Sequence, residues 1–224
     1  MLSVGDNMTG LVELLASFNR KERFFLVGTA LGNPRFCPSD AFRHQLVTLF
    51  DLSIPKDAFV AMDYHLDWMH AALTLAFGAS EDGVHVNDGN ITGNQEDVDL
   101  LFAFDAGEMT HLLLLEAKAE TGWTNKQMHS KARRFAGIFG EDGHRYPLVT
   151  PHLALVSPRP PQQIESERWP AWMTRAGKPL WLELPVPGGL RRVERCDATG
   201  HASAEGSYFR VLRKRQRSVE EVEP

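Results

Sequence analysis

The chain has 224 residues, of which 43% are hydrophobic, so it can bury a substantial core as one domain with a small appendage. Its formal net charge of −5 does not favour a whole-molecule attraction to nucleic acid, so any phosphate contact has to come from a local basic surface. The only two cysteines, Cys37 and Cys196, are isolated, which argues against a zinc ribbon and against a disulfide scaffold.

The sequence also bears on the cellular compartment. It contains no apolar run of membrane-spanning length, and its first residues lack the basic and apolar regions of a signal peptide. We therefore expect a cytoplasmic protein with no membrane partner.

Residues 1–54 are expected to form a helical extension. Short apolar repeats predict one helix at 11–18 and a second that ends near Gly32, and Ser39 is placed to cap a third. The second helix starts with a basic cluster that we interpret as a solvated face: Arg20, Lys21 and Arg23.

A longer helix is predicted between Pro55 and Gly78, because apolar residues recur there at intervals of three and four. Asp63 and Asp67 recur at the same spacing on an adjoining face of this helix. Without further information, a solvated polar face explains both acids equally well.

Two short apolar runs, at 100–104 and 112–115, are joined by turn residues around Gly107 and predict a β-hairpin. Neither run alternates with polar residues, so both faces of both strands are expected to be buried. A turn centred on Gly107 pairs Phe104 with His111.

The same pairing brings charged side chains together at the open end of the hairpin. Counting back from the turn places Asp99 opposite Glu116 and Asp97 opposite Lys118, with the side chains of each pair on one face. Two carboxylates at the edge of a core repel each other and are costly to bury. A divalent cation that prefers oxygen ligands would relieve both penalties.

A polar helix is predicted from Trp123 to Phe139, after the hairpin. Thr124 and Gln127 fit a capping box at its start. Its basic side chains suit phosphate contact, although a solvated face is the usual explanation for such a run. These side chains are Lys126, Lys131, Arg133 and Arg134.

The remaining elements are short. Strands are predicted at 84–86, 152–156 and 180–184, and a helical segment at 164–175. From residue 188 to the end, the pattern indicates a terminal hairpin followed by a charged tail.

The hairpin residues resemble the PD-(D/E)xK motif of the restriction-endonuclease-like nuclease superfamily. Asp99 in VDLLFAF is similar to the motif aspartate, and Glu116, Ala117 and Lys118 in LLLLEAK are similar to the ExK half. Val98 stands where the motif has proline. The predicted order of helices and strands is also similar to the core of that superfamily.

The resemblance implies an α/β (α+β) fold with a restriction-endonuclease-like core, in which helices flank a central mixed sheet of four or five strands. We accordingly divide the chain into three parts. Residues 1–54 form an N-terminal helical extension packed on the core, 55–187 form the nuclease-like core, and 188–224 form the C-terminal hairpin and charged tail.

The resemblance also implies a chemistry. Asp99 and Glu116 would bind Mg²⁺, with Mn²⁺ able to substitute, and the Ala117 carbonyl would add a ligand. Lys118 would orient or activate the attacking water, or stabilise the charged phosphate.

Two further assignments follow from the same resemblance. The superfamily often places another acid near the metal, and either Asp63 or Asp67 matches that role. Gln127 resembles the glutamine of the QxxxY helix motif in the exonuclease branch, although Lys131 stands where the tyrosine would be.

We therefore expect a metal-dependent nuclease acting on nucleic acid, with DNA favoured, and we leave a homodimer open. One alternative is a catalytically silent nuclease-like subunit that binds nucleic acid or serves in assembly. Another is a purely structural hairpin in which Asp97 and Lys118 form a salt bridge. Motifs for nucleotide hydrolysis, dinucleotide binding and serine hydrolases are absent from the sequence.

Overall fold

A mixed five-stranded sheet occupies the centre of the first of two compact units, residues 1–184 and 185–224. The computed structural model describes residues 10–78, 83–94, 96–119, 122–187 and 190–213. The strand order is β1-β2-β3-β4-β5, with antiparallel pairing from β1 to β3 and parallel pairing from β3 to β5. The strands are β1 Phe59–His65, β2 Asp97–Ala106, β3 Met109–Ala117, β4 Val149–Ser157 and β5 Leu180–Glu183. The predicted α/β class with a mixed sheet is thus confirmed.

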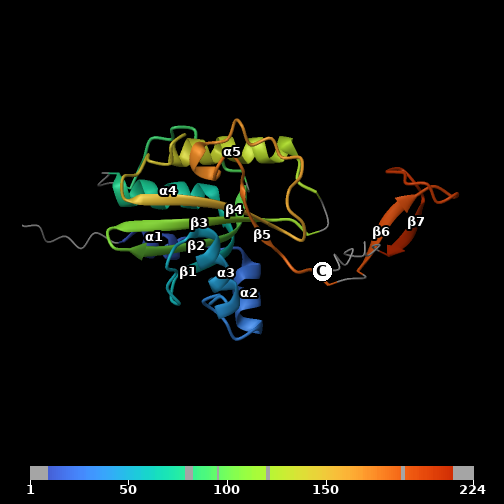
Figure 1. The fold of residues 1–224 in the computed structure, drawn as a ribbon, viewed down its shortest axis with the longest axis horizontal. Helices are drawn as coiled ribbons and strands as arrows, with labels where there is room; N and C mark the ends of the chain where they lie inside the picture. The colour runs from blue at the N-terminus through green and yellow to red at the C-terminus, as the bar shows by residue number, and fades with distance from the viewer. Residues whose placement is uncertain (1–9, 79–82, 95, 120–121, 188–189, 214–224) are drawn as a thin grey trace, which may run out of the picture. The chain divides into compact units, whose positions relative to one another are not determined.

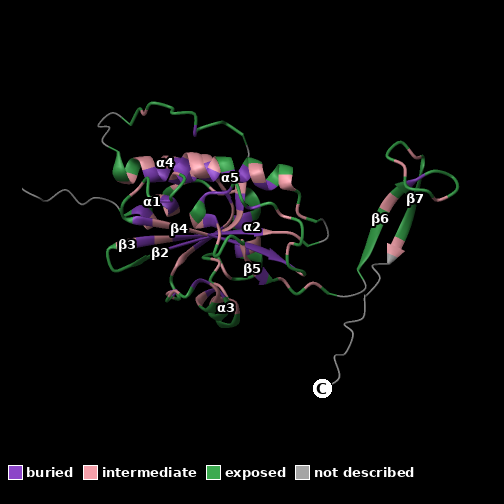
Figure 2. Cartoon of the chain, turned by 45° about the horizontal axis from the view of Figure 1, so that its top comes forward, coloured by how far each residue is buried: buried purple, intermediate pink, exposed green. Residues whose placement is uncertain are grey.

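Helices cover both faces of this sheet (Figure 1). Apolar residues of α1, α4 and α5 pack on one face, and residues of α3 such as Leu46 and Phe50 pack on the other. Buried residues accordingly concentrate on the strands and on the inner sides of these helices (Figure 2). The helices are α1 Leu11–Ser17, α2 Glu22–Ala30, α3 Asp40–Phe50, α4 Leu66–Phe77 and α5 Asn125–Phe139.

The predicted hairpin is confirmed as β2 and β3. Phe104 pairs with His111, and the ladder runs from Ala106 and Met109 at the turn to Leu100 and Leu115 at the open end. Alternate residues of both strands enter the two cores, so both faces are buried as expected. Ser39 and Thr124 cap α3 and α5, because their hydroxyl oxygens accept the N–H groups of Phe42 and Gln127.

The long helix predicted between Pro55 and Gly78 is wrong in its first half. Residues 59–65 form β1, which pairs antiparallel with β2, and the helix begins only at Leu66. The apolar spacing of three and four was fortuitous there. A segment containing Phe, Val and Tyr, which suit strands, instead satisfies its backbone on the neighbouring strand.

Two smaller predictions are also wrong. Residues 84–86 form no strand and belong to a loop that packs against α4. Within 164–175 the only helix is the three-residue 3₁₀ turn Ala171–Met173, labelled η1. Pro170 explains the difference, because its missing N–H and its ring oppose a helix that continues through it.

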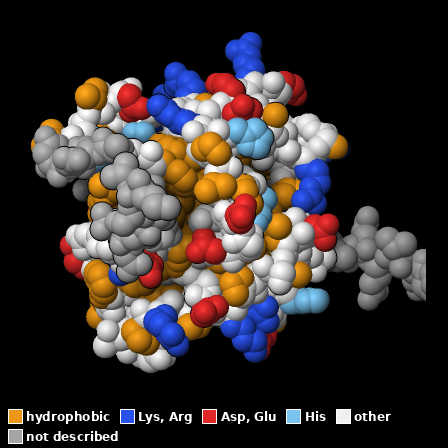
Figure 3. Space-filling view, turned by 90° about the vertical axis from the view of Figure 1, so that its left-hand side faces the viewer, with side chains coloured by type: hydrophobic (Ala, Val, Ile, Leu, Met, Phe, Trp, Pro, Cys, Tyr) orange, Lys and Arg blue, Asp and Glu red, His pale blue; other side chains and the backbone are white. Residues whose placement is uncertain are grey.

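The second unit contains the predicted terminal hairpin, formed by β6 Arg191–Cys196 and β7 Tyr208–Arg213. The predicted charged tail lies outside the described residues. Among the residues that are described, no helix is long and apolar enough to cross a membrane. On the face shown in Figure 3, basic and acidic side chains are interspersed with hydrophobic ones.

The side chains of two histidines on neighbouring strands are in contact. His111 Nδ1 on β3 lies 3.0 Å from His152 Nε2 on β4, and the two rings stack. Phe50 of α3 meets the His152 ring edge-on. Burial, together with the neighbouring His111 and Arg175, lowers the pKa of His152 to about 4.

We predict that this histidine makes the fold sensitive to acid. Because the pKa of His152 is depressed in the folded state, its contribution to stability is complete above pH 6.5 and is lost as the pH falls toward 4. The free energy of unfolding should fall by about 2–3 kcal/mol across that range. In urea titrations, the free energy of unfolding of His152→Gln should fall less steeply with decreasing pH than that of the wild type. The exposed His44→Gln variant should show the same dependence of the free energy of unfolding on pH as the wild type. The same pH dependence in all three proteins would contradict the prediction.

Candidate functional site

Three aspartates from two adjacent strands converge at the open end of the hairpin. Asp63 lies on β1, and Asp97 and Asp99 lie on β2. One carboxylate oxygen from each residue lies within 4.8 Å of the other two. Val98, which separates Asp97 from Asp99, is buried in the same core cluster as Leu101 and Ala103, on the face covered by α4 and α5, so strict alternation does not continue from Leu101 to Asp97.

A local backbone feature accompanies Asp63. The residues on either side of it pair with Val98 and Leu100, so the register sets Asp63 opposite Asp99. Asp63 has φ 50°, a left-handed conformation that aspartate tolerates better than most residues. Of the two acids proposed to complete the site, Asp63 is therefore the one beside Asp99, and it comes from a strand.

Cationic side chains at the start of α2 balance two of these aspartates. Lys21 Nζ pairs with Asp97 Oδ2, and Arg23 Nε pairs with Asp63 Oδ2. Lys21 is largely buried, whereas the Arg23 side chain is 56% exposed. The interpretation of this basic cluster as a solvated face is therefore wrong for Lys21. No local pattern indicated these pairs, because the partners lie 76 and 40 residues away.

Asp99 joins the two halves of the proposed motif directly. Its Oδ2 accepts a hydrogen bond of 2.6 Å from the backbone N–H of Ala117. The motif aspartate and the main chain of the ExK segment are thus in contact, as expected for strands paired in this register.

Glu116 lies beside this group but is paired differently. It is buried, and its Oε1 accepts a 2.7 Å hydrogen bond from Nζ of Lys131 on α5, which is also buried. Lys131 Nζ donates a second hydrogen bond, of 2.5 Å, to the carbonyl oxygen of Asp97. Burial raises the pKa of Glu116 to about 8, while the Lys131 ammonium opposes the rise. Burial thus favours the protonated form of Glu116, and the Lys131 ammonium favours its charged form.

Lys118 does not join the acids through any hydrogen bond or ion pair within the described part of the chain. Its Nζ lies 6.0 Å from the centre of the Trp123 ring. Its side chain lines a cavity of about 300 Å³ together with Ser157 and Arg159. The salt bridge between Asp97 and Lys118 is therefore not formed, and the amine nearest to Glu116 comes from α5.

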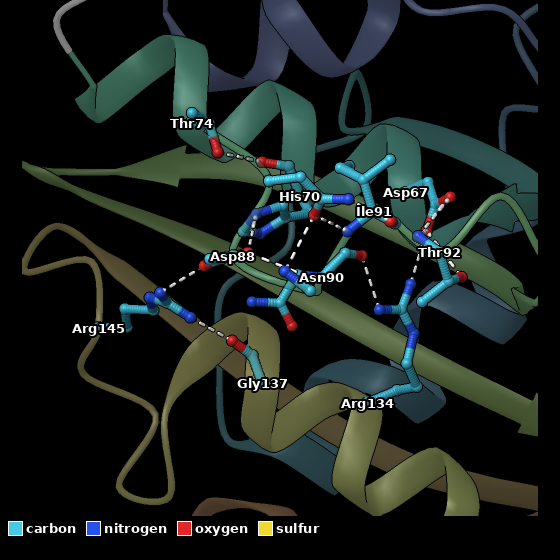
Figure 4. Close-up of polar contacts among 12 residues, drawn as sticks. Asp67, His70, Thr74, Asp88, Asn90, Ile91, Thr92, Arg134, Gly137 and Arg145 are labelled. Carbon is cyan, nitrogen blue, oxygen red and sulfur yellow. Dashed lines mark hydrogen bonds and ion pairs between the residues drawn. The ribbon is translucent and has the colours of Figure 1, made fainter. Parts of the chain in front are cut away.

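Asp67 has a separate structural role. It lies in the first turn of α4 and accepts hydrogen bonds from the backbone N–H groups of Thr92 and Gly93, at 3.2 and 2.8 Å. Arg134 Nη2 donates to it at 2.6 Å and, through Nη1, also binds the carbonyl of Asn90 (Figure 4). Asp67 therefore fastens a loop and α5 to α4 instead of extending the aspartate group.

The basic residues of α5 fall into two sets. Lys131 and Arg134 point inward and pair with acids, so neither is a free phosphate contact. Lys126 and Arg133 are exposed and form no ion pair within the described residues. Gln127 is exposed, its backbone N–H donates to the Thr124 hydroxyl, and its side chain forms no hydrogen bond within the described chain.

Comparison of the chain with protein-family models, with curated proteins and with solved structures finds no match. The resemblance to the nuclease superfamily thus depends on the motif residues alone. The function has to be argued from the geometry of the site itself.

We predict that Lys131→Met destabilises the metal-free protein by about 2–4 kcal/mol, because it leaves Glu116 and the Asp97 carbonyl without their buried donor. The double variant Glu116→Leu/Lys131→Met should be more stable than Lys131→Met alone, since both members of the pair are then removed. Urea unfolding in the presence of a chelator measures the stability of the single variant and of the double variant. Lys126→Met, on the exposed side of the same helix, should change stability by less than about 0.5 kcal/mol. Strictly additive losses in the double variant would contradict this coupling.

Proposed function

We propose that this chain is a divalent-cation-dependent phosphodiesterase that cleaves nucleic acid, with DNA as the favoured substrate. The convergence of Asp63, Asp97 and Asp99 within 4.8 Å supports this proposal most directly. Glu116 and the Ala117 main chain adjoin the aspartates at the same end of the sheet. This arrangement agrees with the resemblance to the PD-(D/E)xK nucleases.

The donor set suits a hard cation. Ligands of an octahedral Mg²⁺ at about 2.0–2.1 Å lie roughly 3–4 Å from one another, and the three aspartate oxygens are already close to that spacing. Mg²⁺ or Mn²⁺ held there would supply Lewis acidity and a more acidic water. Lys21 and Arg23 would have to release their carboxylates, which is easiest for Arg23 because its own side chain is 56% exposed.

The chain's own residues have distinct tasks in this proposal. The Ala117 N–H holds the Asp99 carboxylate in a fixed orientation. Glu116 lies beside the aspartates, and Lys131 donates a hydrogen bond to it that stabilises its charged form. Lys118 follows Ala117 directly and lines an open cavity, so it is available to a phosphate or to the attacking water.

A second candidate is a catalytically silent subunit that binds nucleic acid or serves in assembly. One observation favours it: Asp63, Asp97 and Glu116 each have a cationic side chain as partner, and Asp99 has an N–H donor. The charge that a metal would balance is thereby partly balanced by the chain itself. Activity measurements separate the two candidates.

We predict that the full chain degrades plasmid or linear single-stranded DNA in Mg²⁺ or Mn²⁺ and not in a chelator. Asp99→Asn should lower the rate by at least about 100-fold, because it removes a charged ligand at the centre of the site. Asp57→Asn, an exposed aspartate with the same change of charge, should retain wild-type activity. Cleavage rates of supercoiled and end-labelled substrates provide the measurement.

Comparison of Lys118→Ala with Lys131→Ala then identifies the amine that the reaction needs, provided that each variant unfolds cooperatively. DNA binding by a wild-type protein that cleaves neither substrate in either metal would refute the enzyme and support the silent subunit. Cleavage that is unaffected in Asp99→Asn would refute the proposed site.

A further inference from the structure

A cavity of about 420 Å³ lies on the outer side of α5. Its floor consists of buried, largely apolar residues, and its rim carries exposed charged side chains. The floor is formed by Ala132, Trp169 and Pro170. The cavity therefore combines an apolar surface with a charged edge, as ligand sites of this size commonly do.

The rim is strongly cationic. Lys126, Arg133 and Arg168 line the cavity, against one carboxylate, that of Glu141. None of the three cations forms an ion pair or a side-chain hydrogen bond within the described residues. Three positive charges against one negative charge, beside an apolar floor, favour an anionic ligand.

Trp169 contributes little open surface to this floor. Trp169 is only 6% exposed, and its indole Nε1 is buried without an acceptor among the described residues. The N–H is therefore out of reach of a ligand in the cavity.

The cavity is distinct from the aspartate site. Lys126, His129 and Arg133 recur at three and four along α5, roughly 150° around the helix from the stripe that contains Lys131 and Arg134. That inner stripe binds the acids. The two sites therefore occupy opposite flanks of one helix.

We propose that this cavity binds a nucleoside phosphate, with the base against Trp169 and Pro170 and the phosphate at the cationic rim. The volume exceeds what a bare inorganic anion fills, and an aromatic floor suits a flat base. The inference goes beyond the proposed phosphodiesterase and does not depend on it, because it uses none of the acidic residues. A free nucleotide and the phosphorylated end of a strand present the same chemistry.

Calorimetric titration of the full chain with AMP, with a 5′-phosphorylated oligonucleotide and with inorganic phosphate tests the proposal. We expect saturable one-to-one binding of AMP or of the oligonucleotide. Arg133→Ala/Arg168→Ala should weaken it at least about tenfold, since two charged contacts are lost. Arg35→Ala, which removes an exposed cation elsewhere, should leave the affinity within about twofold. Binding of AMP that the oligonucleotide cannot displace identifies a free nucleotide, and binding of the oligonucleotide alone identifies a strand end.

Trp169→Phe keeps an aromatic floor and removes only the buried N–H. It should leave the affinity for AMP within about twofold, because that N–H is not exposed to the cavity. Asp99→Asn should bind the same ligand normally, whether or not the chain proves to be a nuclease. Absence of saturable binding, equal affinity for inorganic phosphate, or full affinity in Arg133→Ala/Arg168→Ala would overturn the proposal.

Discussion

The buried pair of Glu116 and Lys131 is the interaction on which the rest of the site depends. It joins the end of β3 to α5, and the second bond of Lys131 to the Asp97 carbonyl adds β2. Burying two ionisable groups is costly, so the pair persists only with good geometry and additional hydrogen bonds. By fixing the rotation of α5, it also turns Arg134 toward Asp67. One contact therefore sets which basic residues face the acids and which face solvent.

The aspartate group can balance its charge in two ways. Without a cation, Lys21 and Arg23 from the start of α2 neutralise Asp97 and Asp63. With a divalent cation, the same carboxylates would become ligands and the two side chains would be released. The choice between an enzyme and a binding subunit thus reduces to one competition. A divalent ion bound by three carboxylates must outweigh two hydrogen-bonded monovalent partners, of which Arg23 is the more exposed.

The sequence predicted those parts of the site that depend on local pattern. Turn residues around Gly107 determined the hairpin register, which brought Asp99 to the ExK segment. Prediction from the sequence failed where contacts between distant segments determine the structure. Lys21 contacts Asp97, 76 residues away along the chain. Residues 59–65 form the strand β1 because β2 offered an unpaired edge. The role of Lys131 was also missed, because a basic helix in sequence does not reveal which of its cations turn inward.

The division of α5 reconciles a net charge of −5 with the anion binding that we propose. Lys131 and Arg134 are matched by buried or half-buried acids, so they add little to the external field. Lys126 and Arg133 stand unpaired at the rim of a cavity with a low-dielectric floor, where a charge acts more strongly than in open water. Binding of an anion depends on this local field and not on the total charge. An acidic protein can therefore hold a phosphate on one flank of a helix while its carboxylates gather on the other.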